Sequence, residues 1–178
     1  LTRPGAPVSY GGFASNVDMK SGAPAFGTPE HLKFQVGSGQ LARHIGLPWR
    51  SAAGSAGNTA DMQASQENTM GLWGALMGQA TFVVHAAGWL EGGLASSYEK
   101  FIMDADQLGM AQRMAAGVDL SENGQAMDAI REVGPGSHYL GCADTLANFQ
   151  TAFYASPLMD NNSFEQWQAE GEKRMEHR

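Results

Sequence analysis

The stretch TFVVHAAGWLEGGLASSYEK, residues Thr81–Lys100, decides the fold expected for this chain. It opens with a continuous apolar run, Thr81–Val84, which predicts a strand buried on both faces. The run gives way to His85 and a small-residue bend, and Trp89 and Glu91 follow before a helix begins. Enzymes of the α/β class place chemistry where a buried strand ends in glycine-rich backbone. We therefore predict a functional site around this turn.

Composition excludes several classes of function. The chain has 178 residues, a length typical of one domain, and carries 11 basic against 18 acidic residues, for a net charge of -7. A nucleic-acid surface needs clustered Lys and Arg, and no such cluster occurs. No apolar run reaches the roughly 18 residues that a membrane span needs. We predict neither a nucleic-acid partner nor a membrane partner.

Cysteine and histidine usage argues against a metal centre. The single cysteine, Cys142, excludes an internal disulfide and a cysteine-based zinc site. His85 and His138 lie far apart in the chain, with no third ligand at metal-ligand spacing. We predict no metal site, and the lack of disulfides and of a signal-peptide pattern favours a cytoplasmic location. A G-x-S-x-G elbow, which a serine hydrolase of the α/β class would carry, is also missing.

Three strand candidates alternate with helices. The strand candidates are 6–10, 47–53 and 81–87, and the helix candidates between them are 29–45 and 60–78, capped by Thr28 and Thr59. This spacing is typical of successive βα units in a parallel sheet. A doubly wound sheet usually offers a glycine-rich phosphate loop, and none occurs here. We therefore predict part of a (β/α)8 TIM barrel, since a full barrel needs roughly 250 residues.

The second half of the chain predicts further helices. A helix over 97–116 is expected to turn Phe101, Ile102, Leu108, Met110 and Met114 mostly inward. Further helical segments are expected from Asp119 or Ser121 to Val133, over 143–149 and from Ser163. The chain opens at Leu1 without a methionine and stops within a charged segment. We expect one domain over 1–178, the C-terminal portion of a longer protein cut at both ends.

Six strings carry a resemblance to a known family. They are GTPEH (27–31), ADMQASQE (60–67), HAAGWLEGGLASSYEKF (85–101), MDAD (103–106), GPGSHYLG (134–141) and FYASPLMDNNSFEQW (153–167). In this order they resemble the trimethylamine methyltransferase family of corrinoid-dependent methyltransferases. The resemblance covers nearly the whole chain, and its specific parts are HAAGWLEGG and GPGSHYLG. It implies a TIM barrel of roughly twice this length, with extra C-terminal helices.

The resemblance also implies a reaction and its partners. A methyl group would move from a small methylated amine to the cobalt of a corrinoid (cobalamin), which a cognate corrinoid protein carries. Archaeal trimethylamine enzymes of the family hold their substrate with pyrrolysine, and this chain has ordinary residues at the loosely corresponding positions 57–63. Similar pyrrolysine-free members act on quaternary amines such as glycine betaine. We expect a quaternary or tertiary amine as substrate and a homo-oligomeric protein.

The chemistry of a quaternary ammonium suggests which side chains bind it. Its leaving group is already a neutral amine, so the reaction needs positioning more than acid catalysis. An aromatic wall with nearby negative charge suits such a cation, and Arg50 suits a substrate carboxylate. We predict His85 and Glu91 as catalytic residues. We predict Arg50, Trp89, Tyr98 and Asp61 as substrate-binding residues, and His138 and Tyr139 as residues that contact the corrinoid.

Structural roles compete with these functional ones. His85 would equally suit a core position with a backbone carbonyl as its partner, and Glu91 would suit a salt bridge to a neighbouring loop. Asp61 would suit the first turn of a helix, and His138 a turn cap. Two other functions also stay open. The chain could belong to a non-catalytic barrel that binds a methylammonium compound, or it could be an inactive fragment that self-associates through open sheet edges.

Overall fold

The computed structural model describes residues 3–12 and 14–175. The chain divides into two compact units. One contains the residues up to Leu108, and the other is Gly109–Met175. The helix α3 (Tyr98–Ala115) contributes residues to both units. No helix among the described residues is long and apolar enough to cross a membrane.

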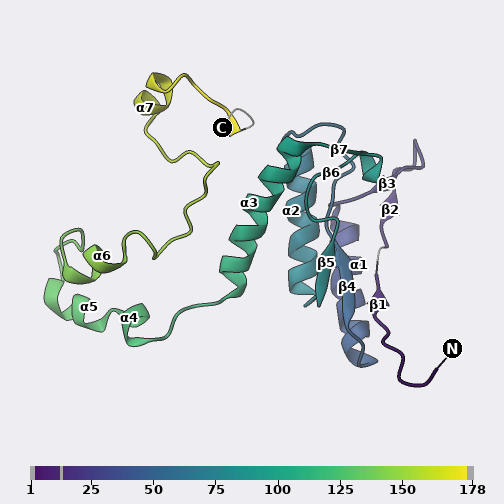
Figure 1. The fold of residues 1–178 in the computed structure, drawn as a ribbon, viewed down its shortest axis with the longest axis horizontal. Coiled ribbons are helices and arrows are strands. Elements are labelled where there is room, and N and C mark those ends of the chain that lie inside the picture. Colours follow the sequence, from purple (N-terminus) through teal and green to yellow (C-terminus); the bar gives the residue numbers. More distant parts are fainter. Residues whose placement is uncertain (1–2, 13, 176–178) are drawn as a thin grey trace. The chain divides into compact units, whose positions relative to one another are not determined.

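The first unit is built on a parallel three-stranded sheet with the strand order β1-β4-β5. Its strands are β1 (Tyr10–Gly11), β4 (Trp49–Ala52) and β5 (Phe82–Val84). In the chain, α1 (Pro29–His44) lies between β1 and β4, and α2 (Met62–Met77) lies between β4 and β5 (Figure 1). The predicted succession of parallel βα units, and with it an α/β fold, is confirmed. Each strand is shorter than predicted, and β5 ends where His85 turns to φ +58°.

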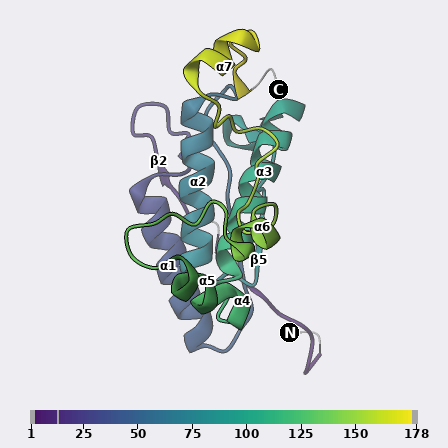
Figure 2. The ribbon, with the colours of Figure 1, turned by 90° about the vertical axis from the view of Figure 1, so that its left-hand side faces the viewer.

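Helices α1 and α2 lie side by side (Figure 2). Both contact β4, on the face that Trp49 and Ser51 share. Glycine allows their close approach, because a Cβ atom at Gly39 would lie 2.0 Å from the carbonyl oxygen of Gly78. On the sheet, Trp49 and Ser51 face the helices and are buried. The side-chain amide of Gln35 in α1 donates to the Ser51 hydroxyl at 3.0 Å. These contacts form the core of the first unit.

The other face of the sheet differs from the prediction. Phe82 pairs in register with Arg50, which in turn pairs with Gly11, so these residues lie on the face opposite Trp49. Phe82 is 54% exposed there. The prediction that this strand is buried on both faces is therefore wrong for this chain, because α1 and α2 pack on the Trp49 face.

The predicted helix starts at Thr28 and Ser163 are confirmed, and the predicted cap at Thr59 is wrong. Thr28 caps α1 by accepting from the backbone N–H of His31, and Ser163 caps α7 (Phe164–Ala169) in the same way. At α2 the cap is Asp61 rather than Thr59. The Asp61 carboxylate accepts from the N–H of Ala64 and from the Thr59 hydroxyl, so Thr59 acts as a donor to the cap.

Two short antiparallel pairs were not predicted. They are β2 (Asn16–Val17) with β3 (Pro24–Ala25), and β6 (Trp89–Leu90) with β7 (Ala95–Ser96). The second pair encloses the 3-10 turn η1 (Glu91–Gly93). Strands of two residues are too short to produce an alternating pattern that a sequence could reveal.

The second unit holds the end of α3 and the short helices α4 (Glu122–Gln125), α5 (Met127–Val133), α6 (Ala143–Asn148) and α7. The single helix predicted up to Val133 is interrupted, because Ala126 adopts the left-handed region at φ +49°. The amide side chains of Asn123 and Asn148 bond to each other and join α4 to α6.

The inward face of α3 also differs from the prediction. Phe101, Ile102 and Met114 are exposed, whereas Lys100 and Asp104 are buried. Residues four apart share one face of a helix, so the buried face near the start of α3 is the one that carries this charged pair. An apolar pattern alone indicated the wrong face.

Candidate functional site

Two loops form one rim at the carboxyl ends of β4 and β5. One loop is 53–57 and the other is the turn over 85–93. The Ala53 N–H donates to the carbonyl of Val84 at 3.0 Å, and the Glu91 N–H donates to the carbonyl of Gly57 at 2.9 Å. The Gly92 N–H donates to the carbonyl of Ser55 at 3.0 Å. The backbone of the loop after β4 thus fixes the backbone around Glu91.

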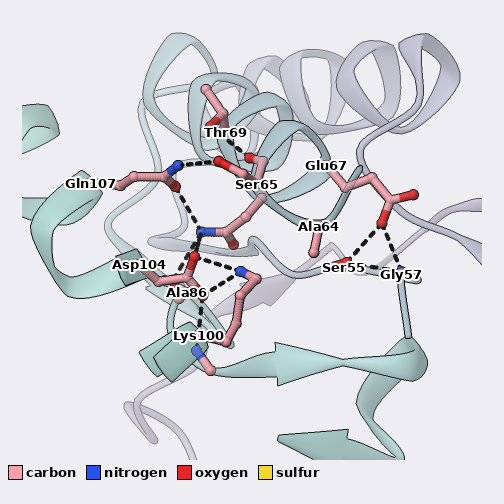
Figure 3. A network of polar contacts seen from close by, with 12 residues as sticks. Ser55, Gly57, Ala64, Ser65, Glu67, Thr69, Ala86, Lys100, Asp104 and Gln107 are labelled. Atoms are coloured by element: carbon pink, nitrogen blue, oxygen red, sulfur yellow. Dashed lines mark hydrogen bonds and ion pairs between the residues drawn. The ribbon is translucent and has the colours of Figure 1, made fainter. Parts of the chain in front are cut away.

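Glu67 of α2 holds the first of these loops in place (Figure 3). Its carboxylate accepts from the Ser55 hydroxyl at 2.8 Å, from the Ala56 N–H at 2.7 Å and from the Gly57 N–H at 3.0 Å. Hydrogen bonds to a charged acceptor are stronger than neutral ones. Ser55 is fully buried, so its hydroxyl depends on this partner. The carboxylate of Glu67 is therefore the main support of the loop after β4.

His85 and Trp89 meet in the turn after β5. Their ring centroids lie 3.9 Å apart at an angle of 65°. The indole packs where neighbouring residues have no side chain, since a Cβ atom at Gly93 would lie 2.4 Å from the ring and one at Gly54 would lie 3.2 Å away. Phe26, which is buried, approaches the indole edge-on at 6.2 Å. The result is an aromatic cluster of Phe26, His85 and Trp89.

A cationic side chain lies beside this aromatic cluster. Arg50 is half-buried, and its guanidinium lies over Gly11, where a Cβ atom would be 3.0 Å from Nη2. Burial lowers the pKa of His85, and the positive charge of Arg50 lowers it further. His85 is therefore neutral at pH 7. A neutral imidazole beside an indole can border a cation without repelling it.

A network of buried polar side chains from α2 and α3 bonds to the backbone of the turn after β5 (Figure 3). The ammonium of Lys100 donates to both carboxylate oxygens of Asp104. Asp104 also accepts from the Gly88 N–H at 2.9 Å and from the Asn68 side-chain amide at 3.0 Å. Burial raises the pKa of Asp104, and hydrogen bonds from Lys100, Gly88 and Asn68 oppose that rise. The same Asn68 amide donates to the Ala86 carbonyl at 3.3 Å.

His31 supports the cluster from α1. It is 2% exposed, and its Nδ1 accepts from the Gly27 N–H at 3.1 Å. Its ring meets Phe26 edge-on at 5.7 Å. Burial lowers the pKa of His31, which agrees with a neutral ring that accepts at Nδ1.

The structure brings some of the predicted site residues together. Arg50, His85 and Trp89 form one group, and Glu91 is tied to it through the backbone of the rim. Glu91 is exposed and adopts φ +51°. Asp61 caps α2. The pKa of its carboxyl is lowered, mainly by the hydrogen bond from the Ala64 N–H and to a smaller extent by the hydrogen bond from the Thr59 hydroxyl.

The remaining predicted residues lie outside the group of Arg50, His85 and Trp89. Tyr98 is 87% exposed in the first turn of α3, where it lines a cavity of about 620 Å³ with Phe101 and Ser97. His138 and Tyr139 are exposed residues of the second unit. Among the described residues, no group of three or more His, Cys, Asp or Glu side chains is placed to hold a metal ion.

Sequence reasoning assigned no role to the residues that support the rim. Glu67 ends the string ADMQASQE, and Asp104 lies in MDAD. The spacing of Lys100 and Asp104, four apart in a helix, was the available signal for a pair on one face. That spacing is also common on solvated helix surfaces, so it does not reveal burial.

Comparison with known proteins identifies the family. The model of the trimethylamine methyltransferase (MTTB) family matches residues 1–178. The chain belongs to this family. The resemblance seen in the six sequence strings is thereby confirmed.

Curated relatives of the trimethylamine methyltransferase family differ in the substrate they are named for. A glycine betaine methyltransferase of Desulfitobacterium hafniense is 41% identical over 94% of this chain and 35% of its own length. Trimethylamine methyltransferase MttB of Methanosarcina barkeri is 34% identical over 97% of this chain and 35% of its own length. A proline betaine:corrinoid methyltransferase of Eubacterium limosum is 36% identical over 79% of this chain and 30% of its own length. The chain thus spans about a third of the length of these relatives. The resemblance in the sequence implied a protein only about twice as long as this chain, so these relatives are longer than expected.

Proposed function

We propose that this chain forms part of a methyltransferase that moves a methyl group from a methylated amine to the cobalt of a corrinoid carried by a separate protein. The match of the family model to all 178 residues carries the proposal. Relatives named for glycine betaine, trimethylamine and proline betaine support an amine as the methyl donor. The name of the proline betaine relative supports a corrinoid as the acceptor.

The fold supports a place for this chain within a TIM barrel. β1, β4 and β5 are parallel neighbours, and α1 and α2 pack on one face of the sheet. In a (β/α)8 barrel the helices form the outer ring and the opposite face of each strand points inward. Arg50 and Phe82 would then face the barrel interior, and the rim over β4 and β5 would lie at the end where such barrels carry their active sites. We propose that residues 1–178 form a single C-terminal portion of such a barrel.

The aromatic cluster suits a quaternary ammonium. Such a cation has no N–H to donate, and it is attracted to an aromatic face and to nearby negative charge. We propose that Trp89 and Tyr98 bind the methylammonium group, with Glu91 and Asp61 supplying negative charge. Arg50 would bind a substrate carboxylate, as betaines carry one. His85 borders the cation as a neutral ring.

The bond changes need no proton. The electron pair of the carbon–nitrogen bond leaves with nitrogen as a neutral amine, and the acceptor supplies the pair for the new bond to the methyl carbon. The protein's task is then to align donor and acceptor and to exclude water. This requirement fits a neutral His85 and favours a quaternary donor. A tertiary amine would first have to become cationic.

The acceptor is assigned to a partner protein. We propose that His138 and Tyr139, both exposed, contact the corrinoid that the partner carries. A cytoplasmic location and a homo-oligomeric state belong to the same proposal.

The test uses the full-length protein, a reduced corrinoid protein and a panel of methylated amines. Glycine betaine, proline betaine, trimethylamine and tetramethylammonium are supplied in turn, and methylation of the corrinoid is followed by absorbance. We expect methylation with at least one quaternary amine and slower methylation by Glu91→Gln. Tight amine binding without methylation would instead indicate a binding barrel. If the protein neither binds any of these amines nor methylates the corrinoid, the proposal is overturned.

A further inference from the structure

The backbone between His85 and Trp89 adopts an unusual conformation. His85 has φ +58° and Gly88 has φ +78°. The left-handed region is readily accessible to glycine but costs a residue with a side chain about 1 kcal/mol. A histidine holds this conformation when its surroundings over-determine it. The contacts of the intervening turn therefore decide how the two rings meet.

Two side chains from different helices form hydrogen bonds to the backbone of this turn, one on each side of Ala87. The Asn68 amide of α2 donates to the Ala86 carbonyl at 3.3 Å. The Asp104 carboxylate of α3 accepts from the Gly88 N–H at 2.9 Å. The Asn68 amide also donates to the Asp104 carboxylate at 3.0 Å, so the two side chains that contact the turn are bonded to each other.

The ion pair of Lys100 and Asp104, which contacts this turn, is costly to bury. Lys100 and Asp104 are each 1% exposed. A buried ion pair can often be replaced by packed apolar side chains without loss of stability, because removing two charges from water offsets their attraction. An apolar side chain, however, could not accept the Gly88 N–H. The position of the Gly88 backbone is thus a consequence of Asp104 that packing alone would not reproduce.

We propose that Asp104, assisted by Asn68, is a positioning residue that sets the backbone between His85 and Trp89. It thereby fixes the geometry of the aromatic cluster, which the proposed function assigns to amine binding. Lys100 neutralises the buried carboxylate and holds it toward Gly88. The proposal rests on the proposed function, because the amine-binding role of Trp89 is part of it. It goes further by assigning a role to buried residues that touch neither donor nor acceptor.

The test compares two double variants of the full-length protein. Lys100→Met with Asp104→Leu removes both charges and the acceptor for Gly88. Lys100→Met with Asp104→Asn removes both charges but retains a carbonyl oxygen that can accept the Gly88 N–H. Lys100 is replaced in both, so neither variant leaves a buried ammonium without a counter-charge. An exposed pair, Asp128 with Arg131, provides the control as Asp128→Leu with Arg131→Met.

Hydrogen exchange and amine kinetics are the two measurements. Loss of a hydrogen bond to a charged group corresponds to a roughly tenfold or larger change in an equilibrium constant. In the leucine variant we expect the Gly88 amide to exchange roughly tenfold faster and KM for the amine to rise by about the same factor. A loss of folded protein would lower kcat and leave KM unchanged. The asparagine variant should recover most of both effects, and the control should match the unmodified protein.

Several outcomes would overturn the proposal. Unchanged Gly88 exchange in the leucine variant would show that Asp104 does not set the turn. Faster exchange with unchanged KM would show that the turn does not position the site. If the leucine variant fails to fold, Asn68→Ala replaces it, with the same expected direction at Ala86 and Gly88. If the unmodified protein methylates no corrinoid, the proposed function fails separately, and the exchange measurement with the affinity for tetramethylammonium still decides the role of Asp104.

Discussion

Replacing Glu67 by alanine should destabilise the protein strongly. The change removes the acceptor for the Ser55 hydroxyl and for the N–H groups of Ala56 and Gly57. A buried donor without a partner costs about 1–3 kcal/mol, and hydrogen bonds to charged acceptors contribute about 1.5–3 kcal/mol each. These contributions are not additive, and water can reach the half-buried Glu67. We therefore expect a loss of about 3–4 kcal/mol in the free energy of unfolding, toward the upper end for single substitutions.

Urea unfolding followed by circular dichroism measures this loss. Glu67→Gln keeps one acceptor oxygen and should lose about half as much. Glu99→Ala is the matched control, because Glu99 is exposed in the first turn of α3 and removing it should cost no more than about 1 kcal/mol. If Glu67→Ala were no more destabilising than Glu99→Ala, the support of the loop after β4 would have to lie elsewhere.

Three other changes test separate parts of the structure. Gly39→Ala would put a methyl group 2.0 Å from the Gly78 carbonyl oxygen, so we expect a loss of about 2–3 kcal/mol in urea unfolding. Gly37→Ala on the same helix should change stability little, because an added Cβ atom there meets no other atom within 4 Å. Burial lowers the pKa of His31, so the unfolded chain takes up a proton first as pH falls through about 6.5. Stability should then decline below that pH by at most about 1.4 kcal/mol per unit for this residue, and the decline should be shallower in His31→Gln. Arg50→Gln should raise KM for glycine betaine and leave the affinity for tetramethylammonium, which has no carboxylate, unchanged.

Local signals in the sequence were sufficient for much of the fold. Thr28 before Pro29 predicted the start of α1, because a hydroxyl cap and a proline suit the first turn of a helix. The spacing of the strand candidates predicted parallel β1, β4 and β5, since a parallel connection requires a crossover helix. The six family strings were sufficient to indicate the trimethylamine methyltransferase family, which the match of the family model confirms.

Signals failed where a residue's surroundings come from distant parts of the chain. Phe82 was expected to be buried on both faces, and its exposure reflects helices on the opposite face. Phe101 and Ile102 were expected inward, yet α3 turns a lysine and an aspartate toward the core. An apolar pattern records which residues prefer burial but does not record which surface has a partner to bury them.

The sequence alone determined the family, the βα succession and the turn in which His85, Trp89 and Glu91 lie. These features depend on residue types at short separations, where backbone preferences and capping act directly. Tertiary structure decided how that turn is held. Asn68 and Asp104 are 36 residues apart, and their contact with each other and with the turn exists only after α2 and α3 have packed. Burial then makes each of these polar contacts necessary, because a donor or acceptor removed from water needs a partner in the protein.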